Sequence, residues 1–537
     1  HSSPPLHRII EHPAILPLDM YSPKCRSIPP KPSSLNCAVV MHETPSAYNQ
    51  LHFILWAEAL SNLHFLKAQR TVESFIMNDT FDFSNRHKDL MARDEEYVLG
   101  WRFEPRIIFE RGEGVRLHDV DGNVYYDLSS GMMSLTLGHS HPELTETIRD
   151  MADRFIHQSS WYTNPWAIEF AELLATTLPG DLKMTNFAVT GSEANEIAMR
   201  MALGATGGFD VVSMVRGLHG GSLAAESMTS VGGARRRGLG PLSMPARSNC
   251  IIPAFYYRAP VDDADEWDDI SLRMTEELIE YTTSQEVAAL MLEPIAVPGG
   301  MIVPSERWLK GIRKIADQWD ALLIFDECQL APARLGTFWG FEPYGVVPDI
   351  VTFGKGLSAG FAFCGAVTTP EIAEKTRGTM GLPWAGTYPQ DPLPAAVALK
   401  QLQVVLRDNL ADHAAKAGAY LEKRLSVLTD KYECIGDIRG RGLYRMLDIV
   451  TDQKSKTPDA EMGEAIRYHA LAEGLVMIVV KNYARICPPT VVTEAELDDI
   501  VGRLDAAIAR AVRGDPVPTN ISASSSLATN NAAKRNI

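Results

Sequence analysis

The sequence has little of what disulfide-rich, zinc-binding or membrane-spanning proteins need. Seven of its 537 residues are cysteine, the count is odd, and no two cysteines form a CxxC pair. A disulfide framework and a cysteine-rich metal site are therefore disfavoured, and a reducing, cytoplasmic compartment is indicated. No apolar run reaches the ~18 residues of a membrane-spanning helix, so no membrane partner is expected.

Positive charge is also scarce. The chain has 51 Lys and Arg residues against 67 Asp and Glu residues, which gives a formal net charge of −16. An acidic surface repels phosphate backbones, so a nucleic-acid partner is not expected. Hydrophobic residues make up 45% and charged residues 22% of the chain, as is typical of globular proteins. At ~150 residues per domain, the length allows three or four domains.

Both ends of the chain lack regular patterning. Nine of the 33 prolines lie within the first 45 positions. Residues 1–76 have neither the basic start and apolar core of a secretory signal nor the Arg-rich, acid-poor composition of a transit peptide. We expect a poorly ordered leader there, or upstream sequence that the working protein does not need, with Met77 as a sensible start. Residues 515–537, rich in Ser, Asn and Ala, are expected to form a disordered tail.

Residues 77–150 are predicted to form an N-terminal arm, a strand meander and part of a small domain. Apolar and polar residues alternate over 107–130, and glycine-containing turns interrupt the alternation at Gly112–Gly114 and Asp121–Gly122. An amphipathic helix is expected over Pro142–Phe155.

Residues 151–410 are predicted to form the large domain, because short apolar runs alternate with helical stretches. This order favours an α/β fold in which helices cover both faces of a mostly parallel sheet. The expected strands are Asp210–Val215, Val287–Leu292, Leu322–Phe325 and Ile350–Phe353. The expected helices are Glu196–Leu203, Leu272–Thr282 and Glu306–Trp319.

Residues 411–514 are predicted to form a smaller, C-terminal α+β domain. One long helical pattern, Asp391–Lys431, leads into it. The sequence RGRGLYRMLDIV predicts a strand, and helices are expected over Ala460–Gly474 and Glu494–Val512.

Two residues that directly follow buried strands suggest chemistry. Asp326 ends the run Leu322–Phe325, and ligands of parallel sheets bind at that end of the strands. A carboxylate there can keep a heterocyclic nitrogen protonated, although a lone Asp also fits a helix cap. Lys355 lies between two glycines after the next strand. A desolvated lysine forms imines, although most lysines in turns are simply exposed.

Two further features are weak alone and informative together. The sequence Thr190–Asn195 leads into an apolar-periodic helix, and the N–H groups at such a start bind anions, although an ordinary N-cap looks the same. Arg485 lies late in the chain, where it fits a bidentate carboxylate site or a surface ion pair. An imine-forming lysine, an acid for a ring nitrogen and a phosphate cup are the parts that hold pyridoxal phosphate (PLP).

These motifs resemble the class III, PLP-dependent aminotransferases of fold type I over about three quarters of the chain. Within that family the chain is most similar to 2,2-dialkylglycine decarboxylase. The family likeness lies in LGHSHPE at 137–143, TGSEANE at 190–196, LHG at 218–220, EPIAVPGG at 293–300, FDECQ at 325–329, FGKG at 353–356 and GT at 386–387. The likeness to the decarboxylase lies in the stretches 387–410, 433–443 and 485–498.

The resemblance implies a role for each matching residue. Lys355 would form the internal aldimine and shuttle a proton, Asp326 would hold the pyridine nitrogen, and Gln329 would contact the ring oxygen. The other expected roles are phosphate binding by Gly191 and Ser192 with Thr387 of a neighbouring subunit, carboxylate binding by Arg485, support from His219 and Glu293, and an alkali-metal ion at Thr387 and Asp391. A homodimer or a dimer of dimers is expected, with an amino donor and a 2-oxo acid acceptor as substrates.

Three positions depart from the decarboxylase. Met132 replaces a Gln that assists bond cleavage, Leu218 replaces an aromatic residue on the ring face, and Pro298 replaces a small polar residue. Methionine cannot donate a hydrogen bond to a carboxylate, so the substrate's CO₂ group is less firmly aligned for departure. We therefore rank amino-group transfer first and decarboxylation-dependent transamination, or a related epimerase reaction, second. A catalytically dead scaffold is the third hypothesis, and the presence of Lys355, Asp326 and Arg485 argues against it.

Overall fold

The computed structural model describes residues 81–100, 103–232 and 249–517, all of which belong to one compact unit, Ser74–Ile537. The predicted leader, residues 1–76, lies outside the described residues, as do residues 518–537 of the predicted tail. No helix within the described ranges is both long and apolar enough to cross a membrane.

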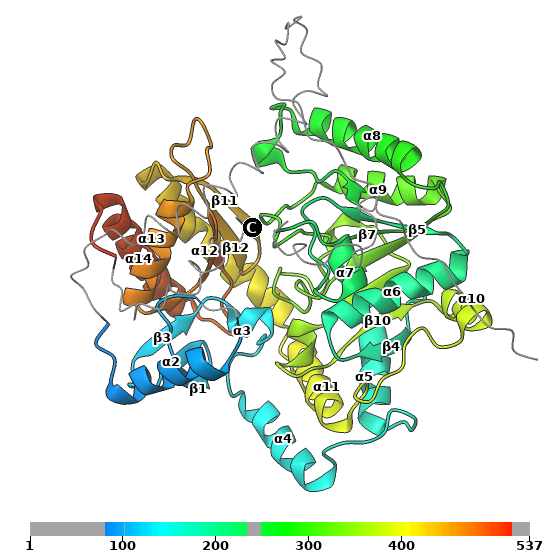
Figure 1. The fold of residues 1–537 in the computed structure, drawn as a ribbon, viewed down its shortest axis with the longest axis horizontal. Coiled ribbons are helices and arrows are strands. Elements are labelled where there is room, and N and C mark those ends of the chain that lie inside the picture. The colour runs from blue at the N-terminus through cyan, green and yellow to red at the C-terminus, as the bar shows by residue number, and fades with distance from the viewer. Residues whose placement is uncertain (1–80, 101–102, 233–248, 518–537) are drawn as a thin grey trace, which may run out of the picture. The chain divides into compact units, whose positions relative to one another are not determined.

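A seven-stranded sheet forms the centre of the larger part of this unit (Figure 1). Strands β5 to β9 run parallel, and only β10 and β4, at one edge, run antiparallel to their neighbours. The mostly parallel sheet predicted for an α/β fold is therefore confirmed. The strands, in spatial order, are β4 Met184–Ala188, β10 Cys364–Thr368, β9 Ile350–Phe353, β8 Leu322–Asp326, β7 Val287–Leu292, β5 Asp210–Met214 and β6 Asn249–Ile251.

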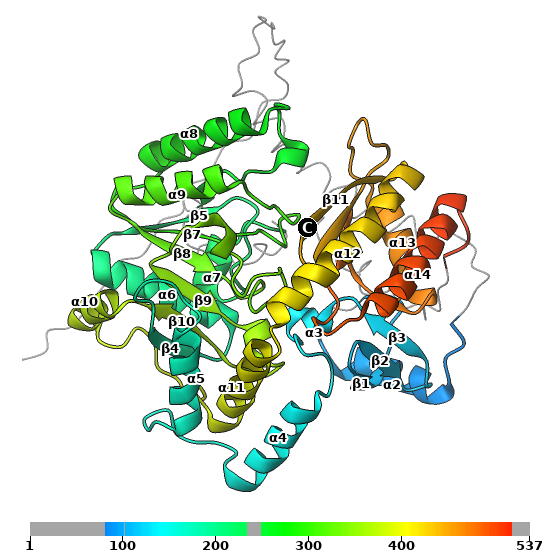
Figure 2. The ribbon, with the colours of Figure 1, turned by 180° about the vertical axis from the view of Figure 1, so that it is seen from behind.

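Helices cover both faces of this sheet. Successive side chains of a strand point to opposite faces, so each face is buried against its own set of helices. Along β7, Leu290 and Leu292 join one apolar core, whereas Ala289 and Met291 join another. The first core includes residues of α5 Pro165–Ala175, α8 Ala264–Thr282, α9 Glu306–Gln318 and α11 Pro392–Arg407. The second includes residues of α6 Gly191–Thr206, α7 Leu223–Met228 and α10 Pro370–Met380 (Figure 2).

The N-terminal strands form the predicted antiparallel meander. β1 Phe109–Glu113 pairs with β2 Arg116–Asp119, and β2 pairs with β3 Val124–Asp127. A short parallel strand, β13 Leu475–Val476, extends this sheet next to β3. The flanking helices are α2 Asn85–Tyr97, the short α3 Ser130–Met133 and α4 Pro142–Arg154.

The C-terminal part contains a second, entirely antiparallel sheet. Its order is β11-β12-β15-β14, with bounds β11 Ile435–Arg441, β12 Tyr444–Ile449, β15 Tyr483–Ile486 and β14 Ile478–Val480. Here the prediction of one strand was wrong, because the backbone turns at Gly442 (φ 54°) and the sequence forms a hairpin. Helices α13 Ala460–Ala472 and α14 Glu494–Arg513 confirm the other predictions.

The long helical pattern Asp391–Lys431 is two helices, α11 and α12 Leu410–Lys431. The prediction missed the break because neither proline nor glycine marks it. Asn409 adopts the left-handed conformation (φ 48°), which asparagine tolerates better than most residues. Helix α11 packs in the core of the large sheet, whereas α12 packs in a separate core with the C-terminal strands.

Candidate active site

Asp326 ends β8 at the carboxyl edge of the parallel strands, and its carboxylate is buried. Oδ2 accepts hydrogen bonds from His219 Nδ1 (2.9 Å) and Asn195 Nδ2 (2.8 Å), and Oδ1 accepts from the Cys328 N–H (3.0 Å). Burial by itself would raise the pKa of Asp326. The bonds from His219, the nearby Lys355 ammonium and the Cys328 N–H outweigh burial, so the pKa lies below its usual value. A buried acid that stays ionised can hold a protonated ring nitrogen.

Lys355 follows β9, the strand next to β8, and therefore lies at the same edge of the sheet. Its side chain is half-buried, and among the described residues it forms neither a hydrogen bond nor an ion pair. The two flanking glycines are needed for packing. A Cβ on Gly354 would lie 2.9 Å from Cys364 Sγ, and one on Gly356 would lie 2.6 Å from the carbonyl oxygen of Ala331. Lys355 itself adopts a left-handed φ of 38°.

The predicted anion cup is the N-terminus of α6. Thr190 and Glu193 form a capping box, in which each side chain accepts a backbone N–H of the other residue. Ser192 Oγ accepts the Gly221 N–H (3.0 Å), so a glycine-rich loop lies against the cup. Gly220 has no room for a Cβ beside Ser192. The first turn of α6 thus presents N–H groups and a hydroxyl to an anion.

Leu218 and His219 lie on the loop after β5. The Leu218 N–H donates to Glu293 Oε2 (3.1 Å), and the other Glu293 oxygen is buried without a partner. Burial, reinforced by the neighbouring Asp326, raises the pKa of Glu293 well above its usual value. Gln329 is buried as well, and its amide oxygen has no hydrogen-bond partner.

Arg485 lies in β15, on the second sheet, and is only 9% exposed. No described carboxylate lies within 4 Å of its guanidinium, and its Nε is buried without a partner. Arg485 is nevertheless close enough to Glu293 to oppose the rise of that residue's pKa. The site therefore contains a buried cation that lacks a counter-ion.

Met132 lies in a left-handed turn and is half-exposed. Four successive residues, Ser130 to Met133, have positive φ values between 47° and 64°. A left-handed conformation costs about 1–2 kcal/mol for each non-glycine residue, so this turn is strained by several kcal/mol. The turn contacts the turn Lys355–Ser358, which begins with the candidate lysine.

Thr387 and Asp391 lie on the segment that leads into α11. Thr387 is exposed. Asp391 Oδ1 accepts from His157 Nδ1 (2.7 Å) and from the Gln158 N–H (3.3 Å). The roles predicted for both residues stay predictions.

The residues present fit PLP. An ionised acid, Asp326, suits the ring nitrogen, and an amine without partners, Lys355, suits the aldehyde. The N-terminus of α6 suits the phosphate. The amide oxygen of Gln329 is buried and has no hydrogen-bond partner among the described residues, as expected of an atom that a bound ligand contacts.

Asn195 is a site residue of the motif TGSEANE to which the sequence alone assigned no role. It is buried on α6, donates to Asp326 Oδ2 and to the His219 carbonyl (2.6 Å), and accepts from Thr352 Oγ1 (2.7 Å). Asn195 thus ties α6 to the ends of two strands. A polar residue on the apolar face of a helix is the signal that could have identified it.

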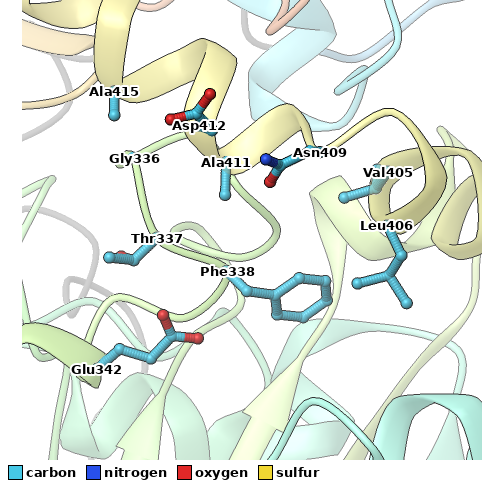
Figure 3. A pocket seen from close by; sticks show the side chains of 10 residues that line it. All are labelled: Gly336, Thr337, Phe338, Glu342, Val405, Leu406, Asn409, Ala411, Asp412 and Ala415. Carbon is cyan, nitrogen blue, oxygen red and sulfur yellow. The ribbon is translucent and has the colours of Figure 1, made fainter.

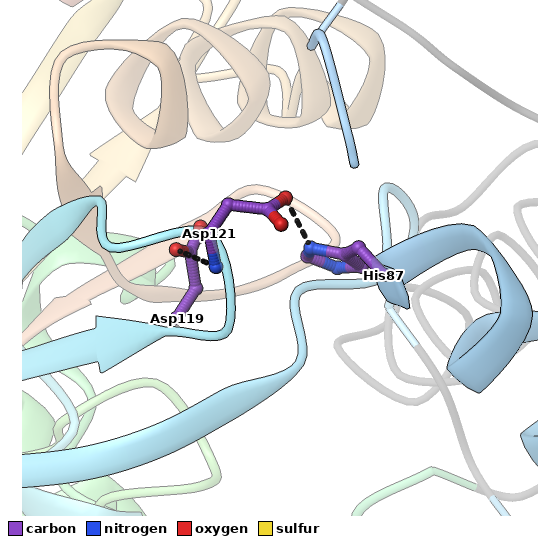
Figure 4. A group of neighbouring side chains, drawn as sticks. All are labelled: His87, Asp119 and Asp121. Carbon is purple, nitrogen blue, oxygen red and sulfur yellow. Dashed lines mark hydrogen bonds and ion pairs between the residues drawn. The ribbon is translucent and has the colours of Figure 1, made fainter. Parts of the chain in front are cut away.

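Two other places in the described chain have features of a site. A pocket of about 410 Å³ lies between the loop Gly336–Glu342 and the break between α11 and α12, and no predicted site residue lines it (Figure 3). His87, Asp119 and Asp121 have the side chains of a metal site (Figure 4). However, His87 Nδ1 already pairs with Asp121, and its Nε2 accepts the Ile108 N–H. This group is a hydrogen-bonded tie between α2 and a turn.

Comparison with known proteins gives consistent matches. The sequence model of the family described as Aminotransferase class-III matches residues 101–508. An uncharacterized aminotransferase of Schizosaccharomyces pombe is 34% identical over 76% of this chain and 92% of its own length. An alanine/serine racemase of Pyrococcus horikoshii is 30% identical over 80% of this chain and 92% of its own. The omega transaminase of Pseudomonas jessenii, solved with PMP, superposes with a TM-score of 0.74 at 26% identity, over 79% of this chain and 98% of its own.

Proposed function

The chain belongs to the class-III aminotransferase family and is a PLP-dependent transaminase, and from this premise we propose that Lys355, Asp326 and Arg485 carry its reaction. The enzyme moves an amino group from an amino acid or amine to a 2-oxo acid. The observation that carries the assignment of residues is the pairing of β8 with β9. This pairing brings the buried Asp326 and the partnerless Lys355 to one edge of the sheet.

Each residue has a distinct task. PLP, when bound, withdraws electrons from the bonds at the substrate's Cα. Asp326 holds a proton at the ring nitrogen, and Asn195 and His219 orient its carboxylate. Lys355 Nζ takes the proton from the substrate's Cα, as a general base with no competing ion pair. Leu218 would pack against the ring, and Gly191 and Ser192 would bind the phosphate.

We propose that the substrate carries a carboxylate at the reacting end. Arg485 is buried and has no counter-ion in the part of the chain that the structure describes, and a buried charge is costly until it is paired. A substrate carboxylate supplies the missing anion through a bidentate contact. Amino acids are therefore favoured over amines that lack a carboxylate.

Two alternatives follow from specific observations. Decarboxylation-dependent transamination of the 2,2-dialkylglycine type rests on the sequence resemblance, and Met132 counts against it. Amino-acid racemisation rests on the similarity to the Pyrococcus horikoshii racemase. Incubation with 2-aminoisobutyrate and pyruvate tests the first by CO₂ release. Loss of optical activity of L-alanine without a 2-oxo acid tests the second.

The decisive experiment is a screen of amino donors with pyruvate, run on the wild-type protein and on Lys355→Ala. We expect transamination by the wild type and a loss of at least about 10³-fold in Lys355→Ala, because a positioned base contributes 10²–10⁴-fold. Lys183→Ala, which removes an exposed lysine paired with Asp181, is the control. A visible cofactor band that persists unchanged in Lys355→Ala would refute the assignment.

We propose that two copies of the chain assemble through the segments 155–164 and 380–391. Trp161 is 92% exposed and Tyr388 is 59% exposed. The two segments are joined by a hydrogen bond, which Asn164 Nδ2 donates to the Gln390 carbonyl oxygen (2.8 Å). A large apolar surface on an ordered scaffold marks an interface. Thr387 lies within it, so each subunit can present this hydroxyl to its partner's phosphate.

We also propose domain boundaries, a cellular location and an alkali-metal site. A domain boundary near residue 410 is supported by the separate cores around α11 and α12, and assigning part of 77–150 to the small domain is supported by Val115, Tyr126 and Leu128 in the core around α12. A cytoplasmic location is supported by the buried thiols of Cys328, Cys364 and Cys487. An alkali-metal ion at Thr387 and Asp391 is tested by exchanging Na⁺ for K⁺ in the assay.

A further inference from the structure

We propose that Asp127 is a positioning residue, because it locks the left-handed turn Ser130–Met133 that sets the spacing between Lys355 and Arg485. The proposal rests on the proposed function for the roles of those two residues. That one carboxylate holds this turn depends only on the hydrogen bonds of Asp127.

Asp127 ends β3 and its side chain is fully buried, and among the described residues this side chain bonds to Ser129, to Gly131 in the turn and to His139, which precedes α4. Oδ1 accepts from the Ser129 N–H (2.8 Å) and Ser129 Oγ (2.6 Å). Oδ2 accepts from the Gly131 N–H (2.8 Å) and from His139 Nε2 (2.9 Å). Four donors on one carboxylate can hold a backbone that its own residues disfavour.

Arg334 clamps the same turn from the opposite side. Its guanidinium is fully buried, donates to Ser130 Oγ (3.1 Å) and to the Met133 carbonyl oxygen (3.3 Å), and also contacts Cys487 Sγ (2.8 Å). The turn therefore contacts both an anion, at Ser129 and Gly131, and a cation, at Ser130 and Met133. Neither group takes part in the reaction proposed above.

The chain around the turn joins the two elements that bear the reactive residues. On the arginine side, the N–H of Cys487, two residues after Arg485, donates to the Leu128 carbonyl oxygen (2.8 Å). Towards the lysine, Thr136 Oγ1 donates to the carbonyl oxygen of Gly356 (3.1 Å), the residue after Lys355. We therefore expect a change in the turn between Leu128 and Thr136 to alter the distance between Lys355 and Arg485. That distance matters only for substrates that use both residues.

The test compares Asp127→Asn with Asp119→Asn in the purified enzyme. Asp119 is a matched control, because it is buried in the same sheet and also accepts four hydrogen bonds, all from the hairpin turn 121–125. In Asp127→Asn we expect hydrogen exchange of the segment 128–136 to rise at least tenfold. We also expect the preference for an amino acid over the matching amine without a carboxylate to fall at least tenfold. Asp119→Asn should change neither quantity.

Ser129→Ala keeps the test decisive if Asp127→Asn does not fold. This variant removes one donor to Asp127 and should raise exchange of the same segment by a smaller factor, so unchanged exchange in Ser129→Ala also overturns the proposal. Asp127→Asn combined with Met132→Asn should regain exchange protection, because asparagine tolerates the left-handed conformation. Equal exchange and equal selectivity in Asp127→Asn and Asp119→Asn overturn the proposal. If the wild type transfers no amino group, the proposed function fails, and the exchange measurements still decide whether Asp127 holds the turn.

Discussion

At the scale of single residues, the chemistry depends on polar groups that the fold leaves without partners. Arg485 is buried and has no described carboxylate within 4 Å. Glu293, the acid that it influences, has a raised pKa because of burial and Asp326. An acid whose pKa is raised is a weaker counter-ion than an ordinary carboxylate, so the charge of Arg485 remains available to a ligand.

Replacement of this guanidinium tests the substrate class. Arg485→Lys keeps the charge and loses the bidentate geometry, which is worth about 1.5–3 kcal/mol for a charged hydrogen bond. We expect the KM for an amino-acid donor to rise about 10-fold to 100-fold, and the kinetics with a carboxylate-free amine to change little. Arg445→Lys is the control, because Arg445 lies on the adjacent strand β12 and contacts backbone carbonyls and Glu422. An equal loss with both donors would show that Arg485 has a structural role only.

At the scale of elements, the start of α6 combines a cap with a candidate phosphate site. Thr190 and Glu193 close the capping box and leave the neighbouring N–H groups directed outwards. Helix α14 also begins with a capping box, formed by Thr493 and Glu496, and no predicted phosphate-binding residue lies on this helix. A comparison of the two helices therefore distinguishes the contribution of a cap to protein stability from its contribution to ligand binding.

Thr190→Ala and Thr493→Ala should each lower the free energy of unfolding by about 0.5–2 kcal/mol, the usual cost of losing a threonine cap. Only Thr190→Ala should also raise the dissociation constant for PLP, because its helix carries the phosphate cup. Chemical denaturation and fluorescence titration of the stripped protein measure the two effects. Unchanged affinity in Thr190→Ala, at the expected loss of stability, would place the phosphate elsewhere.

At the scale of the whole molecule, buried acids make stability depend on pH. Glu327 is fully buried, and burial raises its pKa to about 8 despite hydrogen bonds from the Gly340 and Phe341 N–H groups. Its pKa in the unfolded chain is about 4.3. Between these values the folded state holds a proton that the unfolded state has released, so rising pH favours unfolding.

The free energy of unfolding should therefore fall as the pH rises from about 5 to 8. Each group contributes at most about 1.4 kcal/mol per pH unit, and Glu327→Gln should flatten the slope by up to this amount. Urea denaturation at fixed protein concentration across this range provides the measurement. An identical slope in the variant would mean that Glu327 is ionised in the folded state. Asp326, whose pKa is lowered, acts with the opposite sign, since its stabilisation is lost as the pH falls below about 4.

Assembly is also a property of the whole molecule. Trp161→Glu places a charge in the proposed apolar interface and should convert the dimer to monomers in sedimentation experiments. Activity should fall with dissociation, because Thr387 would no longer reach a partner's site. Tyr281→Glu, at a residue 78% exposed on α8, is the control and should leave the oligomer unchanged. A wild-type monomer with full activity would contradict both parts of this prediction.

The parallel sheet and the order of the cofactor motifs could be predicted from the sequence because both are local signals. Buried strands are short apolar runs in the sequence, and Asp326 and Lys355 lie at the carboxyl ends of two of them. Parallel strands end at one edge of the sheet, and the pairing of β8 with β9 brings the two residues together there. The break at Asn409 and the hairpin at Gly442 were missed because one left-handed residue leaves little trace in a pattern.

Only the tertiary structure decided which polar groups have partners. Asn195 meets Asp326 across 131 residues of sequence, and Arg334 meets Ser130 across 204. Periodicity cannot reveal contacts between such distant segments. The same reason explains the lone charge of Arg485 and the strained turn held by Asp127, because an absent counter-ion and a left-handed backbone both depend on everything that packs around them.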